Sequence, residues 1–311
     1  MIQYLKHQAI DKNHWDECIR KSQNRRIYGF SWYLDLVCPG WEALVEDDYT
    51  YVFPLTGRSK WAVHYLFQPY FTQQLGIFSP QPITDFKVNL FINNIPAKFR
   101  FAEIHLNDKN NFKIEKGETT LRLNHELDLT PIYEELLTGY AQNTRRNLRK
   151  AQEMGVSLGR MVRTDELISL FRDNFGKTEG KLRHSHYETL HSLIDCMLVR
   201  KMGYILGAYA DNGHLSAAAF FLFDQQRVHY LFAASSPEAR ENGAMFFLID
   251  SFIRENANKS MILDFEGGND TNLGRFYKSF GSREVPYPML HINKLPVIAV
   301  RALYFARKLR R

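Results

Sequence analysis

The chain has 311 residues, of which 45% are hydrophobic and 24% are charged, and its formal net charge is +6. This composition is that of a globular protein with about two domains, and it excludes a disordered chain or a collagen-like repeat. The excess of Lys and Arg favours an anionic partner without identifying it.

Cysteine content and terminal sequence bear on the compartment. Cys18, Cys38 and Cys196 lie far apart and cannot all pair, which indicates a reducing compartment without a disulfide framework. The N-terminus lacks the apolar core of a signal peptide, and no run approaches the roughly 18 apolar residues of a membrane span. We therefore expect a cytoplasmic protein.

The first part of the chain reads as mixed α/β. An amphipathic helix is expected over residues 11–21, with Trp15, Cys18 and Ile19 facing inward. The apolar runs at 49–55 and 61–67 alternate like two strands that pair across a turn at 56–60. Further helices are expected over 27–37 and 85–95, and further strands over 99–106 and 119–127.

Residues 68–78 form a polar and aromatic stretch without periodicity. Loops of this composition beside strands often line clefts, so Tyr70 and Gln73 are candidate substrate-binding residues. The alternative is aromatic packing beneath a long connection.

A basic helix is predicted over residues 131–154, capped by Thr130 and broken near Gly139. Helical spacing gathers its apolar residues on one side and four basic residues on the other. The basic side is either a solvated surface or a ridge that contacts the phosphates of tRNA or of another anionic donor. The basic residues are Arg145, Arg146, Arg149 and Lys150.

After Gly155, the expected domain boundary, the periodicity predicts a second α/β unit. Asp211-Asn212-Gly213 between two apolar runs is a strong hairpin signal. The spacing of Phe246, Phe247, Ile249, Phe252 and Ile253 is helical. Strands are expected over 156–162, 203–209, 215–222, 227–234, 261–265 and 288–292, and further helices over 165–175, over 186–198 and ending near 280–281.

Three segments resemble a known superfamily. Residues 237–245, Pro-Glu-Ala-Arg-Glu-Asn-Gly-Ala-Met, are similar to the acyl-CoA loop of the GCN5-related N-acetyltransferases (GNAT). Residues 264–281, with Asp-Phe-Glu-Gly-Gly and Phe-Tyr-Lys-Ser-Phe-Gly, and the helix at 143–155 resemble the Fem-type peptidoglycan aminoacyltransferases and their relatives. The order of strands and helices after residue 203 is also that of the GNAT core.

The resemblance implies an α/β protein with two tandem GNAT-like domains, each a mostly antiparallel sheet flanked by helices. The domains would span residues 1–154, which are degenerate, and 155–294, which carry the donor site. The polar loop at 176–184 would admit the acceptor. The co-substrate would be acyl-CoA or aminoacyl-tRNA, without a metal, and the acceptor an amine, for example on a cell-envelope precursor. Arg240, Asn242, Gly243 and Ala244 would bind the donor at a helix N-terminus, between separated strands.

Catalytic roles follow from the same resemblance. Asp264 and Glu266 share one strand face, where either could deprotonate or hold the amine, although an Asp at a strand end often only caps a turn. Tyr277 matches a tyrosine that protonates the leaving group, and a core tyrosine is the alternative. Lys278 would contact substrate, unless it is a surface lysine. The histidines at 184, 186 and 191 lack a ligand set for a metal.

Two positions favour a rival hypothesis. Glu241 places a negative charge in the anion-binding loop, and Met245 places a long side chain where Gly or Ala is usual. A non-catalytic GNAT-like module that binds an anionic metabolite or nucleic acid is therefore the alternative function. The basic segment 295–311 would either contact anionic lipid, at the inner face of the membrane, or pack back on the domain.

Overall fold

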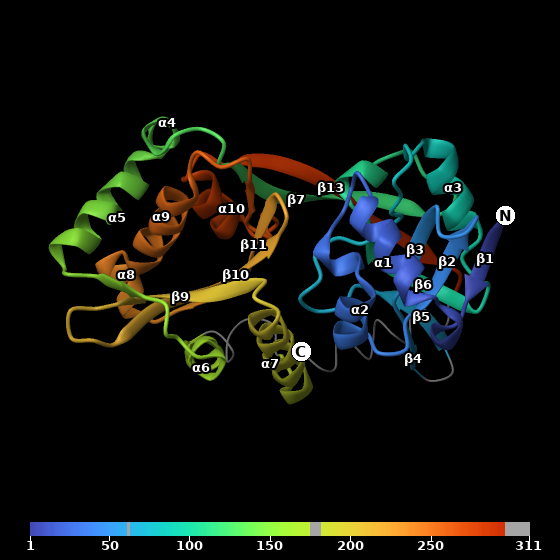
Figure 1. Ribbon diagram of the computed structural model, residues 1–311, viewed down its shortest axis with the longest axis horizontal. Coiled ribbons are helices and arrows are strands. Elements are labelled where there is room, and N and C mark those ends of the chain that lie inside the picture. The colour runs from blue at the N-terminus through green and yellow to red at the C-terminus, as the bar shows by residue number, and fades with distance from the viewer. Residues whose placement is uncertain (61–62, 175–181, 296–311) are drawn as a thin grey trace. The chain divides into compact units, whose positions relative to one another are not determined.

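The structure, a computed structural model, describes residues 1–60, 63–174 and 182–295, and it has the mixed α/β fold expected from the sequence (Figure 1). Its contacts divide the chain into two compact units. Unit 1 contains residues 1–122 and the chain from Tyr287 onward, and unit 2 contains Leu123–Pro286.

The division lies elsewhere than the boundary expected at Gly155. Residues 123–154 belong to unit 2, because Leu127, Leu136 and Ala151 are buried in its core. The last strand in the described residues belongs to unit 1, because its residues Met289–Asn293 pair with residues 101–105. Unit 2 is therefore not the simple C-terminal half of the sequence.

Unit 1 contains two sheets over one apolar core. The first joins β1, β2 and β3 in antiparallel order, and the second joins β4, β5, β6 and β13, with β5 and β6 parallel. The strands are β1 Ile2–Leu5, β2 Glu42–Glu46, β3 Tyr51–Leu55, β4 Gly57–Lys60, β5 Val63–Phe67, β6 Phe99–His105 and β13 Arg283–Asn293. The helices are α1 Lys12–Lys21, α2 Ser31–Val37 and α3 Asp85–Asn93, and the 3-10 turns are η1 His7–Ala9, η2 Ile27–Gly29 and η3 Asp108–Asn110.

The expected hairpin of residues 49–55 with 61–67 is wrong. β3 pairs with β2, a strand that the sequence pattern did not indicate, and the expected turn contains β4, which pairs with β5. All five residues of β3 are buried, whereas Arg58, Ser59 and Lys60 of β4 are exposed. A short polar strand resembles a turn in sequence, because no buried face imposes alternation on it.

Buried asparagines hold part of the 68–78 loop in unit 1. The Asn24 side-chain amide donates to the Ile77 carbonyl at 2.7 Å, and that of Asn107 donates to the Leu75 carbonyl at 2.8 Å. The Asn110 Oδ1 atom accepts from the Ile77 N–H at 2.6 Å and would lie 2.2 Å from a Cβ at Gly76, whose φ is +101°. This segment is fixed by hydrogen bonds, and only glycine fits at Gly76.

Unit 2 has a mixed sheet with strand order β7, β12, β11, β10, β9, β8, in which only β11 and β12 are parallel neighbours among the described strands. Helices α5 and α9 lie on one face, and α6 and α7 on the other (Figure 1). The strands are β7 Glu118–Asp128, β8 Ser157–Gly159, β9 Gly203–Tyr209, β10 Leu215–Asp224, β11 Arg227–Ser235 and β12 Ile262–Asp264. The helices are α4 Tyr133–Thr138, α5 Gln142–Glu153, α6 Thr164–Asn174, α7 His184–Val199, α8 Glu238–Asn242, α9 Ala244–Asn256 and α10 Thr271–Lys278.

The break in the basic helix near Gly139 is confirmed, because α4 and α5 are separate helices. The expected cap at Thr130 is wrong: Ile132 occupies the N-cap of α4 without a side-chain hydrogen bond. The Thr130 N–H instead donates to the Asp128 carboxylate at 2.9 Å, which closes a turn directly after β7.

None of the helices in the described ranges is long and apolar enough to span a bilayer. The basic segment expected to contact lipid lies, from residue 296 onward, outside the described residues.

Candidate functional site

Strands β11 and β12 separate at the centre of unit 2. Their parallel pairing includes only three residue pairs and ends at His229 opposite Asp264. Beyond this point β11 continues to Ser235 beside β10, whereas the Phe265 N–H donates to the His125 carbonyl of β7 at 3.0 Å. The expected separation of two adjacent strands is therefore present.

Aromatic residues lie at the point of separation. The ring of Tyr277, from α10, stacks on Phe265 at 4.8 Å, and the ring of Tyr230, from β11, lies 6.2 Å from Tyr277. The Tyr230 hydroxyl donates to the Met245 sulfur at 3.1 Å. Burial raises the pKa of both tyrosines, with a smaller contribution from Glu266 at Tyr277. Both hydroxyls therefore remain protonated and can act as proton donors.

β11 carries a bulge beside this point. Phe221 pairs with Tyr230 and Phe220 with Phe232, so Leu231 has no opposite residue on β10. A bulge bends the strand and interrupts the ladder, which leaves backbone groups available to a ligand. The bulged residue lies two positions after His229, the last residue that pairs with β12.

The donor loop is more closed than its sequence indicates. Residues Glu238–Asn242 form the short helix α8, and Gly243 links it to α9 with a φ of +72°. The Asn242 Oδ1 atom accepts from the Ala244 N–H at 2.9 Å, so a side chain already binds the first N–H of α9. Asn242 and Ala244 are buried, whereas Arg240 is exposed.

Gly243 lies against the backbone of α5. A Cβ at this position would meet the Asn147 carbonyl oxygen at 2.5 Å, which explains the glycine by packing. Among the basic residues of α5, Arg145 donates to the Leu137 and Thr138 carbonyls and so caps α4. The other basic residues of α5 that are exposed are Arg146, Arg149 and Lys150.

Asp264 is held by three donors. It accepts from the Asn124 side-chain amide at 2.8 Å, from the Arg227 guanidinium at 2.7 Å and from the Glu266 N–H at 3.0 Å. Arg227 also binds Glu126 at 2.6 Å. With both oxygens engaged in the core, Asp264 is better suited to positioning its neighbours than to proton transfer.

Glu266 forms a close pair with His229. The Glu266 Oε1 atom lies 2.5 Å from His229 Nδ1, and the side chain of His229 is fully buried. Glu266 has a φ of +59°, a left-handed conformation that costs a non-glycine residue about 1 kcal/mol. Strain of this kind is frequent at functional sites, and it turns the chain directly after β12.

Sequence reasoning missed four members of this cluster, Asn124, Glu126, Arg227 and His229. Arg227 and His229 alternate with apolar residues at the start of β11, and this alternation was the available signal. Burial lowers the Arg227 pKa, but Asp264 and Glu126 outweigh that effect and raise it, so the guanidinium stays charged.

Ligand atoms of His229, Asp264 and Glu266 lie within 4.8 Å of one another, a spacing that a metal ion would accept. The cluster does not fit a cation well, because Asp264 already binds Arg227 and Asn124. The guanidinium supplies the positive charge that a metal would bring.

The remaining predicted site residues include an exposed lysine of unit 2 and two residues of unit 1. Lys278 is exposed and its ammonium lies 3.3 Å from the Glu284 carboxylate, as in a surface ion pair. Tyr70 and Gln73 belong to unit 1, and residues 176–181 of the expected acceptor loop lie outside the described residues. Unit 2 thus brings together Tyr277, Asp264, Glu266 and the donor loop.

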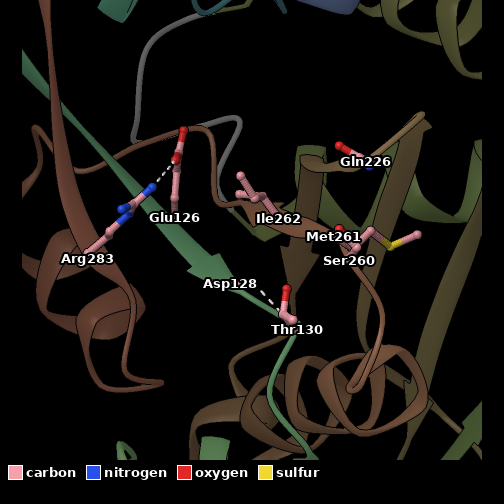
Figure 2. A pocket seen from close by; sticks show the side chains of 8 residues that line it. All are labelled: Glu126, Asp128, Thr130, Gln226, Ser260, Met261, Ile262 and Arg283. Carbon is pink, nitrogen blue, oxygen red and sulfur yellow. Dashed lines mark hydrogen bonds and ion pairs between the residues drawn. The ribbon is translucent and has the colours of Figure 1, made fainter.

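A cavity of about 300 Å³ lies over the beginning of β12 (Figure 2). It is lined by residues from β7, from the turn between β10 and β11, from β12 and from the chain after α10. The lining residues are Glu126, Asp128, Thr130, Gln226, Ser260, Met261, Ile262 and Arg283.

Comparisons with known proteins agree with this geometry. Residues 139–279 match the acetyltransferase (GNAT) domain family. The solved structure of FemX is similar over 97% of this chain and 99% of its own, with a TM-score of 0.64 and 13% sequence identity. A conserved protein of unknown function from Bacteroides thetaiotaomicron VPI-5482 is similar over 93% of this chain and 100% of its own, with a TM-score of 0.58 and 11% identity.

No curated protein sequence matches the chain. The family match covers β11, β12, the donor loop and α10, whereas β7 lies outside it, and the structural matches show a shared fold. Residues 139–279 therefore match a GNAT acetyltransferase domain, and the chain has a fold similar to that of FemX.

Proposed function

We propose that the protein is an N-acyltransferase or aminoacyltransferase, which moves an acyl group from acyl-CoA or aminoacyl-tRNA to an amine. The observation that carries this proposal is the end of the β11–β12 pairing at His229 and Asp264, with Tyr277 and Glu266 beside it. A donor lying between the separated strands would present its carbonyl to these groups.

The reaction proceeds by direct attack. Glu266, paired with His229, accepts a proton from the acceptor ammonium, and the free amine attacks the donor carbonyl. A C–N bond forms, the tetrahedral intermediate collapses, and the bond from carbon to the leaving sulfur or ribose oxygen breaks. Tyr277 donates its proton to that leaving atom and regains the second proton that the attacking nitrogen loses, while Glu266 releases its proton to solvent. The positioned Asp264 holds the Glu266 backbone.

The two donor classes place different demands on the loop. The first N–H of α9 is occupied by Asn242, and α5 packs against Gly243, which leaves less room for a diphosphate than an open loop would. The exposed Arg146, Arg149 and Lys150 of α5 favour a larger polyanion such as tRNA. Aminoacyl-tRNA is accordingly the donor that we favour, and acyl-CoA remains the competing donor.

In this proposal the chain carries two GNAT-like domains. Unit 2 holds the donor site, and unit 1 is a degenerate copy in which Tyr70 and Gln73 contact the acceptor. An acceptor on a cell-envelope precursor, and contact of the segment from residue 295 with the inner membrane face, belong to the same proposal.

Mass spectrometry of products tests the function. The full chain is incubated with amine acceptors and either acetyl-CoA or a mixture of charged tRNAs, and the acylated amine is measured against a Tyr277→Phe variant. Donor-dependent product that falls in the variant supports acyl transfer. Product from acetyl-CoA alone removes the tRNA branch, and no product from either donor contradicts the proposal.

The closed donor loop favours one further candidate, a non-catalytic module that binds an anionic metabolite or nucleic acid. The Asn242 cap and the contact of Met245 with Tyr230 both occupy space at the separated strands. Thermal stabilisation by uncharged tRNA, without product from any charged donor, would select this candidate.

A further inference from the structure

The cavity over β12 lies on the same sheet face as the Glu266–His229 pair. Side chains alternate along a strand, so Glu126 and Asp128 of β7 share one face with Ile262 and Asp264 of β12, their partners in register. A row of side chains joined by hydrogen bonds and ion pairs connects the cavity to the Glu266–His229 pair. Glu126 binds Arg227, Arg227 binds Asp264, and Asp264 accepts the Glu266 N–H.

The charge of this row is negative. Asp264 and Glu126 both pair with Arg227, and Glu126 also lies 3.5 Å from Arg283. Hydrogen bonds from Thr130 lower the pKa of Asp128, which keeps this carboxylate ionised. The charged residues that line the cavity are two carboxylates, Glu126 and Asp128, and one guanidinium, Arg283, and this excess of negative charge favours a cation.

The walls of the cavity define what kind of cation fits. Figure 2 shows Ile262 and Met261 at the start of β12 with their side chains directed apart, Asp128 and Thr130 below them, and Arg283 directed toward Glu126. Apolar side chains beside a carboxylate suit an alkyl chain that ends in an ammonium group. A volume of about 300 Å³ admits a short chain of this type.

The position of the cavity separates it from the reacting atoms. From Ile262 to Asp264 the strand rises about 7 Å, and Glu266 lies further along the chain. An ammonium held by Asp128 is therefore too far from Glu266 to be the amine that reacts. A second amine at the other end of the same molecule would reach it.

We propose that the cavity binds a distal ammonium group of the acceptor, so that the preferred substrate is an extended molecule with two amino groups. This assignment of the acceptor rests on the proposed acyltransferase function. The binding of an alkylammonium group in the cavity does not rest on that function, because it requires no acyl donor.

Isothermal titration calorimetry without a donor tests the binding step. The probes are n-butylamine, 1,4-diaminobutane and butyrate, each titrated into the full chain. The two amines are expected to bind saturably, and butyrate is expected not to bind. Asp128→Asn should weaken amine binding about tenfold, and Ser260→Trp, which fills the cavity without a change of charge, should abolish it. Glu153→Gln removes an equal charge at an exposed position of α5 and serves as the control.

Absence of saturable amine binding to the wild-type protein overturns the proposal. Amine binding by Asp128→Asn and Ser260→Trp that equals wild-type binding overturns it as well. So does butyrate binding as well as the amines. Acylation assays then separate this result from the fate of the function. If the protein transfers acyl groups but no amine binds in the cavity, only the proposed amine-binding site is rejected. If amines bind in the cavity but no amine is acylated, the proposed function and the role of the cavity in acceptor binding are rejected.

Discussion

Arg227 and Asp264 form an ion pair across two parallel strands, with Nη1 2.7 Å from Oδ2, and Asp264 belongs to the last residue pair before those strands separate. Both side chains are largely buried, and Glu126 supplies a second carboxylate to the same guanidinium. Asp264 also accepts a hydrogen bond from the Glu266 N–H, so the pair orients the backbone directly after β12.

Replacement of Arg227 with Met should lower the free energy of unfolding by about 3–5 kcal/mol, because two buried carboxylates lose their counter-ion. Urea denaturation followed by circular dichroism measures the loss. Arg172→Met, at an exposed position of α6, is the control and should change stability by less than about 0.5 kcal/mol. An equal effect of both substitutions would show that the buried pair does not stabilise unit 2.

Tyr277→Phe should lower kcat about 100-fold, since it removes the proton donor for the leaving group. The ring stacks on Phe265, and Phe preserves that contact, so stability should change little. Steady-state kinetics and thermal unfolding are measured together. Tyr65→Phe in unit 1 is the control, and unchanged kcat in Tyr277→Phe would assign this tyrosine to the core alone.

Gly243→Ala should destabilise the protein by about 2–4 kcal/mol, because it adds both a positive-φ cost and a contact with the Asn147 carbonyl oxygen. Gly213 has a similar φ of +81° with nothing within 4 Å of an added Cβ. Gly213→Ala therefore isolates the backbone cost, about 1 kcal/mol. Equal melting temperatures of the two variants would contradict the close packing of α5 on the donor loop.

His105 should make stability depend on pH. Burial lowers its pKa to about 4, although the hydrogen bond to the Gln73 carbonyl opposes this effect. Between pH 4 and the unfolded value of about 6.5, the unfolded chain binds a proton that the folded chain does not. The free energy of unfolding should therefore fall as pH decreases through this window, by up to about 3 kcal/mol from this residue.

His105→Gln should flatten that dependence, since glutamine can still donate to the Gln73 carbonyl but does not titrate. Chemical denaturation at a series of pH values from 4 to 7 compares the two proteins. An identical slope in wild type and variant would show that His105 is not the group responsible.

Much of unit 2 is readable in the sequence. The Asn212-Gly213 turn, the switch to helical spacing after Gly243 and the break at Gly139 each depend on local backbone preference, and each appears where expected. The motifs at 237–245 and 264–281 identify the superfamily for the same reason, because they are contiguous. Asp264 and Glu266 were found through them.

Local patterns failed where the partner is distant in sequence. The pairing of β3 with β2, and the packing of 123–154 with unit 2, depend on which buried surfaces meet. The surroundings of Asp264 and Arg227 depend on Asn124 and Glu126, which lie more than 100 residues away along the chain.

The sequence by itself determined most local elements of unit 2 and the match to a GNAT domain, since hairpin turns, helical periodicity and contiguous motifs need only neighbouring residues. Tertiary structure alone decided that Asp264 is neutralised by Arg227, that Glu266 pairs with His229 and that Asn242 closes the donor loop. A carboxylate acquires its chemistry from the charges and dipoles around it, and folding brings those groups together from separate strands.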